Sequence, residues 1–509
     1  MAQQLQNITI AAPGFFGLNT QDSPVGLNPS FASIADNCVI DQYGRVGARQ
    51  GYTEVTTNGA SVLGSSVGIE MIHQYRDSDG NEVVLSAGNN KIFSGTTTLV
   101  DETPAAYTIT ANNWKAVNFN DHTYMVQRGY EPLIYSDHAG AVEPMSTHTH
   151  ATGTPPEGNE ILAAYGRIWI ADFETDKSTI YWSDLLNGSG WSGGSTGSLD
   201  VTKHWPNGYD EITALAAHNG LLVIFGKNSI LVYEGATSPS TMVLADTIAN
   251  IGCVARDTVQ NIGTDLVFLS ATGVRSLART IQEKSAPIRD ISRNVRNDIN
   301  ALLSLESGNI NSVYSPENAF YLLNFPSKNI VYCFDMRSPL EDGSYRATTW
   351  SQINPLCFHR LEDGTIYLGH STGITQYGGY NDNGDTYDLS YFSNPLDFGN
   401  AANLKFLKKF TLTIIGGQST QAVLNWGYDY SAAYEKETFT LAAQKVAEYG
   451  SAEYNTDDAV YSTGIILNTS GVNTTGNGSV VTVGVEATIN DGPFSIQKID
   501  ILALLGRLI

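Results

Sequence analysis

The sequence predicts an all-β protein: a β-propeller of about seven blades, with roughly six or eight as alternatives, between an N-terminal extended arm and a C-terminal β-sandwich-like domain. The composition points this way, because the chain has 49 Gly and 26 Tyr but only 16% charged residues. Such a chain is rich in turns and strands. The two other observations are a recurring hairpin pattern and a near absence of long amphipathic helices.

The hairpin pattern is clear in "GRIWIADFETDKSTIYWSD" (Gly166–Asp184), where two alternating apolar strands flank a polar turn. Similar segments are Gly80–Gly95, Asp121–Asp137, His218–Gly235, Gly263–Arg279, Glu317–Asp335 and Glu362–Gly379. Their spacing is mostly about 40–50 residues, as in propeller blades. We interpret Gly166–Asp184 as the inner strand pair of one blade. A series of β-sandwiches is the alternative.

The repeats suggest three regions. Residues 1–52 are rich in Gly, Asn and Pro and are expected to form the extended arm; residues 53–384 form the propeller, and residues 385–509 the sandwich. One helix is expected near 287–304, with Ser285 as its cap and Pro287 in its first turn.

The net charge of −23 argues against DNA binding by counterion release. An acidic surface does suit a wall along which DNA slides, and it also suits plain solubility. The four cysteines have no CxxC spacing, which fits a reducing cytosol. We expect no signal peptide and no membrane helix.

Motifs that carry chemistry are weak. G-x-S-x-G occurs at Gly64–Gly68 and Gly193–Gly197, but neither lies between a strand and a helix. Asp172, Glu174 and Asp176 could act as paired carboxylates, although an acidic turn is the simpler interpretation. We therefore predict no catalytic residue, no cofactor, no metal site and no enzyme.

Two possible metal sites have simpler explanations. His148 and His150 fit a linker better than a metal site. The turns Arg76–Glu82 and Tyr380–Asp388 cluster acids around a glycine at the wrong offset for an EF-hand, so hairpin turns are favoured over calcium sites.

Three segments carry a family resemblance: "GFFGLNTQDSPVGLNPSFASIADNCVIDQYGRVGARQGYT" (Gly14–Thr53), "DEITALAAHNGLLVIFGKNSILVYEG" (Asp210–Gly235) and "FSIQKIDILALLGRL" (Phe494–Leu508). With them the chain resembles the tail nozzle proteins (tail tubular, or DNA-stabilisation, proteins) of short-tailed bacteriophages. The resemblance is one of overall pattern and spans most of the chain.

The resemblance implies a virion structural protein, made in the host cytoplasm and placed in the phage tail. It would form a homohexamer, a ring below the portal adaptor protein that attaches tail fibres or a needle. Double-stranded DNA would pass through the lumen without tight binding, so the ring would help retain and release the genome. The alternatives are a propeller glycosidase and a carbohydrate-binding adhesin acting on host surface glycans.

Arg289, Arg293 and Arg296 fall together on one face of the expected helix. In so acidic a chain, such a stripe is either a solvated face or a subunit interface. Arginine pairs with carboxylates in two-point fashion, so contact with an acidic surface of the next subunit is the sharper hypothesis.

Overall fold

The computed structural model describes residues 4–24, 26–64, 68–105, 107–136, 140–283, 290–400, 402–416, 420–431, 433–441 and 467–508. These fall into two compact units. The propeller unit contains residues 54–331 and 354–377, and the sandwich unit contains residues 1–53, 332–353 and 378–509. Strands β6 (Tyr52–Glu54) and β28 (Ile330–Asp335) each span a boundary between them.

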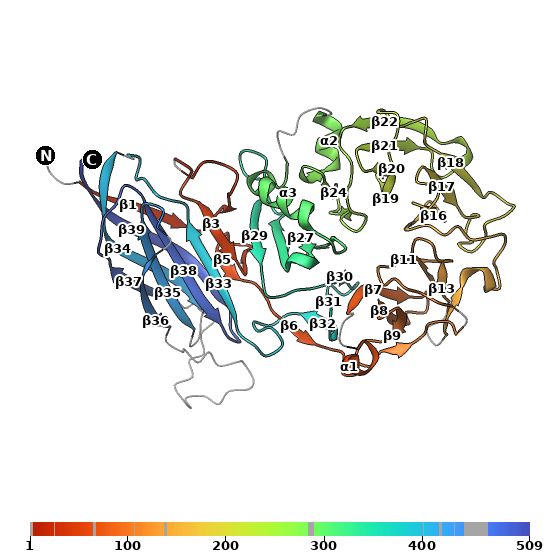
Figure 1. The fold of residues 1–509 in the computed structure, drawn as a ribbon, viewed down its shortest axis with the longest axis horizontal. Helices are drawn as coiled ribbons and strands as arrows, with labels where there is room; N and C mark the ends of the chain where they lie inside the picture. Colours follow the sequence, from red (N-terminus) through yellow and green to blue (C-terminus); the bar gives the residue numbers. More distant parts are fainter. Residues whose placement is uncertain are drawn as a thin grey trace. The chain divides into compact units, whose positions relative to one another are not determined.

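In the described part of the propeller unit, seven antiparallel sheets follow one another along the chain (Figure 1). The first sheet contains β7 (Ile69–Arg76), β8 (Glu82–Gly88), β9 (Lys91–Ser94) and β10 (Val100–Asp101). The second contains β11 (Lys115–Phe119), β12 (His122–Val126), β13 (Leu133–Tyr135) and β14 (Val142–Pro144). The third contains β15 (Glu160–Ala164), β16 (Arg167–Ala171), β17 (Thr179–Trp182) and β18 (Gly197–Asp200).

The fourth sheet runs from β19 (Ile212–His218) through β20 (Leu221–Gly226) and β21 (Ser229–Glu234) to β22 (Val243–Ala249). The other three sheets have fewer strands inside the unit. The fifth contains β23 (Gln260–Asn261), β24 (Leu266–Ser270) and β25 (Gly273–Ser276), and the sixth contains β26 (Asn311–Ser315) and β27 (Phe320–Phe325). The seventh contains β30 (Cys357–Arg360), β31 (Ile366–His370) and β32 (Gly373–Tyr377).

The first strand of each sheet lies innermost, and neighbouring inner strands touch, as β7 touches both β11 and β30. The seventh sheet therefore adjoins the first, where Gln74 N donates to His359 Nε2 at 3.1 Å. Thr56 N, at the start of the unit, donates to Ile374 O at its end, at 3.2 Å. The unit is a closed β-propeller, which confirms the predicted fold class.

The hydrophobic core lies between successive sheets. Tyr75 of the first sheet meets Tyr135 of the second edge to face, with ring centroids 5.0 Å apart. Phe225 and Phe268 meet at 5.0 Å between the fourth and fifth sheets. Phe93 of the first sheet and Ile374 of the seventh share a cluster, so apolar packing also closes the ring.

The predicted hairpins correspond to the middle strands of the sheets. Gly166–Asp184 contains β16 and β17, and β15 lies inside them, so its interpretation as the inner pair was wrong. The middle strands are largely apolar and buried, as in β16, where all five residues including Arg167 are buried, because sheets cover both of their faces. Inner strands carry polar groups toward the axis, so they lack the long apolar run by which the middle strands are recognised in the sequence.

Helices are short: α1 (Gly59–Val62), α2 (Leu277–Glu283) and α3 (Arg296–Leu305). The helix expected from Pro287 thus begins at Arg296, after a 3₁₀ turn at Arg293–Val295. The reason is that Ile291 N donates to Val274 O at 3.1 Å and Ser292 Oγ accepts from Val274 N at 2.9 Å, which ties this segment to β25. Ser285 and Pro287 lie outside the described residues.

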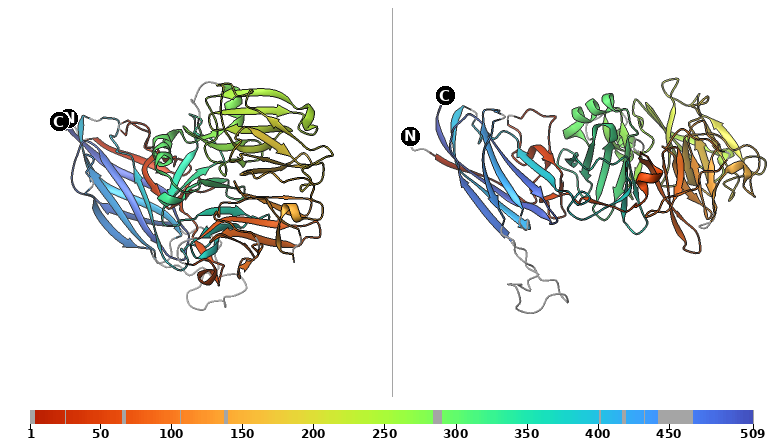
Figure 2. Two further views of the ribbon diagram at one scale, coloured as in Figure 1. Left: turned by 45° about the vertical axis from the view of Figure 1, so that its right-hand side comes forward. Right: turned by 60° about the horizontal axis from the view of Figure 1, so that its bottom comes forward.

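The sandwich unit has two sheets, which Figure 2 shows from two further sides. One contains β1 (Gln4–Ala11), β4 (Cys38–Ile40), β5 (Val46–Ala48), β34 (Asn403–Gly416), β37 (Leu467–Asn473) and β39 (Phe494–Leu508). The other contains β2 (Gly17–Leu18), β3 (Phe31–Asp36), β29 (Arg346–Trp350), β33 (Tyr387–Ser393), β35 (Gln421–Tyr428), β36 (Glu435–Thr440) and β38 (Val481–Ile489).

The first 53 residues are part of this sandwich and not a separate arm. β1 pairs with β39 from Gln4–Leu505 to Ala11–Lys498, and β3 pairs with β33. Residues 332–353 also belong to it. The expected boundaries at residues 52 and 384 therefore lie close to points where the chain passes from one unit to the other, after residues 53 and 377. The sandwich, however, is assembled from three separate segments.

A buried arginine joins these segments. Arg49 is fully buried, donates to both oxygens of Asp382 at 2.8 and 2.7 Å, and lies over the Tyr387 ring at 4.0 Å. Its Nε donates to Asn37 Oδ1 at 2.9 Å, and that oxygen also accepts from Ser351 N. One guanidinium thus binds groups from the N-terminal, middle and C-terminal segments.

Gly51, two residues later, allows the backbone to approach this site. Its N–H donates to Gly379 O, and a Cβ there would lie 1.7 Å from Asn381 O. We expect Gly51→Ala to lower the free energy of unfolding by roughly 2–4 kcal/mol, since backbone must move. Gly378→Ala is the matched control, because Gly378 N bonds to Gly51 O but a Cβ there meets nothing within 4 Å. Equal thermal unfolding midpoints would contradict this.

Candidate functional site

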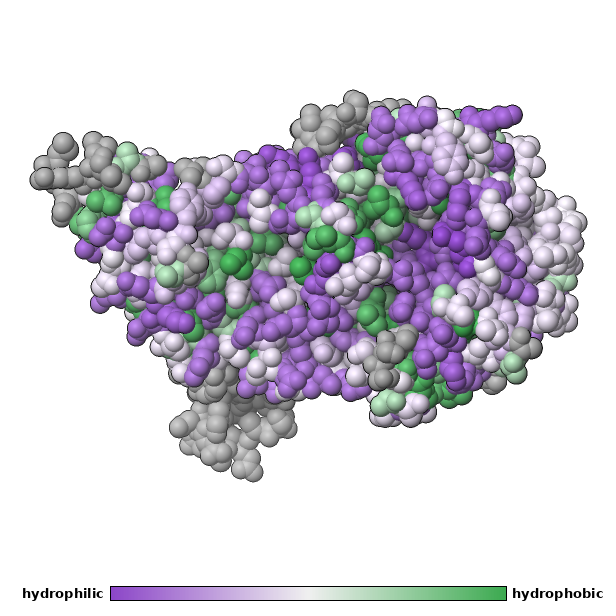
Figure 3. All heavy atoms as spheres, viewed as in Figure 1, coloured by the Kyte–Doolittle hydropathy of each residue, from purple (hydrophilic) through white to green (hydrophobic). Residues whose placement is uncertain are grey.

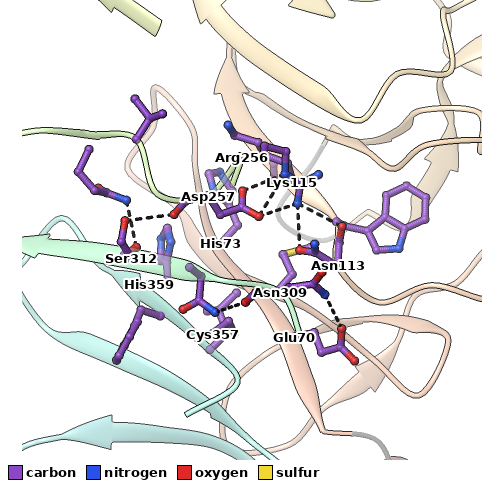
Figure 4. A pocket seen from close by; sticks show the side chains of 18 residues that line it. Glu70, His73, Asn113, Lys115, Arg256, Asp257, Asn309, Ser312, Cys357 and His359 are labelled. Atoms are coloured by element: carbon purple, nitrogen blue, oxygen red, sulfur yellow. Dashed lines mark hydrogen bonds and ion pairs between the residues drawn. The ribbon is translucent and has the colours of Figure 1, made fainter. Parts of the chain in front are cut away.

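The strongest candidate site is a cavity of about 340 Å³ on the propeller axis, which we call the axial cavity (Figure 4). Inner strands β7, β11, β26 and β30 and the segment that leads into β23 line it. A second cavity of about 450 Å³ shares Glu70, Asn113 and Asn309 with it. Hydrophilic residues gather around the middle of the propeller unit on the face that Figure 3 shows.

Arg256 crosses the axis beside this cavity. Its guanidinium donates to both carboxylate oxygens of Asp257 at 2.9–3.1 Å, to Asn159 O and Oδ1 at 2.6 and 3.0 Å, and to Asn113 O and Oδ1 at 3.3 and 2.9 Å. Burial by itself would lower the pKa of Arg256, but the surrounding carboxylates, Asp257 first, raise it overall. The side chain therefore stays charged and ties together the entries to β11, β15 and β23.

A second buried pair supports the same region. Glu160 is fully buried on β15 and accepts from Lys115 Nζ at 2.7 and 2.8 Å and from Leu215 N at 2.9 Å. Burial raises the pKa of Glu160, and Lys115 opposes this increase. The pair thus links the inner strands β11, β15 and β19.

Two histidines, His73 of β7 and His359 of β30, line the cavity with ring centroids 5.3 Å apart. His359 Nε2 accepts from Gln74 N, which places its proton on Nδ1. His73 Nε2 lies 2.9 Å from Asn118 Oδ1, whose amide nitrogen donates to Gln74 O; the proton of His73 is therefore on Nε2. Burial lowers the pKa of His73 to about 4, and burial together with His73 lowers that of His359 to about 3.

Glu70 differs from the other charged groups of the cavity, because its carboxylate has no cationic partner in the described part of the chain. Its oxygens accept only from Asn112 Nδ2 at 3.5 Å and Asn309 Nδ2 at 3.3 Å. Both bonds are long for a charged acceptor.

Two of the three arginines expected on one stripe are among the described residues, Arg293 in a 3₁₀ turn and Arg296 at the start of α3. Arg296 pairs with the buried Asp290 at 2.5 Å, and Asp290 also pairs with Arg275 at 3.2 Å. Arg293 and Arg296 are both partly buried, and their role at a subunit interface stays a prediction. Arg289 lies outside the described residues.

The weaker motifs have local roles. Asp172 is buried and bound by Arg128, Lys177 and Asn159. Asp77 Oδ1 accepts from Asp79 N and Asn81 N within its own turn. His148 Nδ1 contacts Glu143 at 2.8 Å, and Ser195 donates to Asp184. Ser66 lies outside the described residues.

The described residues contain no group of three or more His, Cys, Asp or Glu side chains arranged to hold a metal ion. No helix among them is long and apolar enough to cross a membrane. All four cysteines are buried as free thiols.

No protein-family model and no curated protein matches this chain. Similar solved structures include the extracellular domain assigned to a one-component system of B. thetaiotaomicron (TM-score 0.43, 12% identity, 65% of this chain and 40% of that chain). A second is the Neurospora crassa Pan2 WD40 domain (TM-score 0.37, 10% identity, 65% of this chain and 95% of that chain). A third is YCF48 bound to D1 peptide (TM-score 0.35, 11% identity, 62% of this chain and 93% of that chain). The chain thus spans less than half of the first. Nothing about function follows from likenesses this distant.

Replacing Arg256 should destabilise the propeller unit. In Arg256→Met, Asp257 loses its cation and the acceptors of Asn113 and Asn159 lose their donors, so we expect a loss of about 3 kcal/mol in urea unfolding. Lys91→Met removes the exposed pair of Lys91 with Asp101 and should cost about 1 kcal/mol or less. Equal losses of unfolding free energy in the two variants would show that the bonds of Arg256 do not stabilise the propeller unit.

The two histidines should make stability depend on pH. An unfolded imidazole binds its proton near pH 6.5, whereas folded His73 and His359 do so only near 4 and 3. Between these values the unfolded chain binds more protons, so the free energy of unfolding falls as the pH falls from 6.5 toward 4. His359→Gln should make this dependence shallower, and substitution of the exposed His150 by Gln should not. Identical slopes in urea titrations would refute the assignment.

Proposed function

We propose that this protein is a structural component of a short-tailed phage virion, a tail nozzle subunit that assembles into a homohexameric ring. The observation that supports the proposal most is the joining of both ends of the chain in one sandwich. Two segments that carry the resemblance, Gly14–Thr53 and Phe494–Leu508, pair strand to strand as β5 and β39, with Val46 opposite Ile496. The same N-terminal segment supplies Asn37 and Arg49 for the buried bond to Asp382.

This architecture has the form that a ring subunit needs. A propeller offers a rigid body with many turns on its surface, and a second β unit offers separate surfaces for contacts between copies. Portal adaptor, tail fibre and needle proteins are the partners that the proposal assigns to those surfaces.

The DNA path in such a ring would lie between copies and not along the propeller axis. Arg256, Asn113 and Asn159 meet across that axis, and the cavity beside them is closed in by inner strands. The net charge of −23 would then keep passing DNA from sticking to the lumen wall.

The assembly prediction can be tested on purified protein. We expect mass photometry to find a hexamer and electron microscopy to find a closed ring. Arg293→Glu should reduce assembly, because it reverses a charge at the expected interface, and its thermal midpoint shows whether the subunit itself still folds. Lys203→Glu makes the same reversal at an exposed site of the propeller unit and should assemble normally. A strictly monomeric native protein would rule out the ring.

DNA binding gives a second test. We expect duplex DNA to bind only weakly, even at low salt, since the chain has 28 Lys and Arg against 51 Asp and Glu. Fluorescence anisotropy of a labelled duplex over a salt series measures this. Tight binding that weakens steeply with salt would contradict a non-adhesive lumen wall.

A further inference from the structure

Several polar atoms at the axial cavity have no hydrogen-bond partner in the part of the chain that the structure describes. Asn113 uses its Oδ1 on Arg256 and Gln260 uses its Nε2 on Ser312 O, which leaves Asn113 Nδ2 and Gln260 Oε1. Asn309 uses its Nδ2 on Glu70 and leaves Oδ1. The two histidines leave the Nδ1–H donor of His359 and the Nδ1 acceptor of His73.

From this set of atoms we infer that the axial cavity binds a small polyhydroxylated ligand, a saccharide unit. The free groups include donors and acceptors that line one cavity, and a hydroxyl group donates one hydrogen bond and accepts two. Several hydroxyls on one rigid ring would satisfy both kinds of group at once.

Glu70 decides among the ligand chemistries. It lies where the two cavities meet, and its only partners are the long bonds from Asn112 and Asn309. A carboxylate of this kind accepts strongly from a ligand hydroxyl. It repels the negative charge of phosphate or sulfate, and a polyamine would leave Asn113 Nδ2 and the His359 N–H unpaired.

Recognition would occur through hydrogen bonds and not through aromatic stacking. Trp114 lines the cavity, but it is only 2% exposed, packs against Tyr130 at 5.8 Å and donates its indole N–H to Ala111 O. Arg256 is held by Asp257 and Lys115 is held by Glu160, so both side chains line the cavity in fixed positions. Sites that pair buried polar groups with ligand hydroxyls discriminate strongly against analogues without them.

Saccharide binding does not depend on ring assembly, because every residue named here belongs to the propeller unit of one chain. A monomeric protein that binds sugar would refute the ring alone, and a ring that binds none would refute the cavity's role alone.

The experiment uses saturation-transfer NMR on the full chain with glucose, galactose, mannose, rhamnose and N-acetylglucosamine as probes, and with spermidine and sulfate as comparison ligands. We expect transfer to at least one sugar and to neither comparison ligand. Glu70→Ala and Asn309→Ala should each weaken that binding about tenfold, since each removes a polar contact to the ligand. Glu174→Gln, at an exposed carboxylate outside the cavity, should bind as the native protein does.

Thermal unfolding of each variant ensures that lost binding does not reflect lost structure. Asn309 is exposed and its substitution should leave the fold intact, so at least one variant is informative. The proposal is overturned if no sugar of the panel receives saturation, if spermidine or sulfate binds in place of sugar, or if binding is unchanged in both folded cavity variants.

Discussion

The propeller unit depends on one constraint, the burial of a permanently charged guanidinium on its axis. Arg256 is only 8% exposed, so each of its donors must find an acceptor inside the protein. The chain supplies those acceptors from the entries to three sheets, at Asn113, Asn159 and Asp257. Apolar packing between sheets leaves their angular positions adjustable, whereas these directional bonds hold the inner strand ends at defined distances.

The same constraint produces the cavity. Asn113 uses its amide oxygen to accept from Arg256, so its amide nitrogen has no partner within the described ranges. Lys115 is bound by the buried Glu160 and is therefore not available to pair with other groups of the cavity. Of the polar groups that β7 and β30 bring to the axis, the Glu70 carboxylate then has only two long bonds, and the Nδ1 atoms of His73 and His359 have none among the described residues. A rigid, polar and partly unsatisfied pocket is therefore a consequence of closing the propeller around an arginine, and it can coexist with a structural role for the outer surface.

The sandwich unit follows the same logic with Arg49. Its bonds to Asp382, Asn37 and Ser351 join segments that are more than 300 positions apart in the chain. The pairing of β1 with β39 adds backbone bonds between the two ends of the chain.

By itself, the sequence determined the all-β class, the repeat of about seven units and the middle hairpin of each sheet, because alternation and turn residues are local signals. It could not reveal the inner strands, whose polar residues such as Asn311 and His359 resemble loop residues until they meet at an axis. It placed the helix start at Pro287 because the bonds that Val274 makes with Ile291 N and Ser292 Oγ leave no mark in the periodicity of the sequence. The cavity was also missed: Glu70, Asn113, Arg256, Asn309 and His359 are scattered along the chain, and only closure of the ring brings them together.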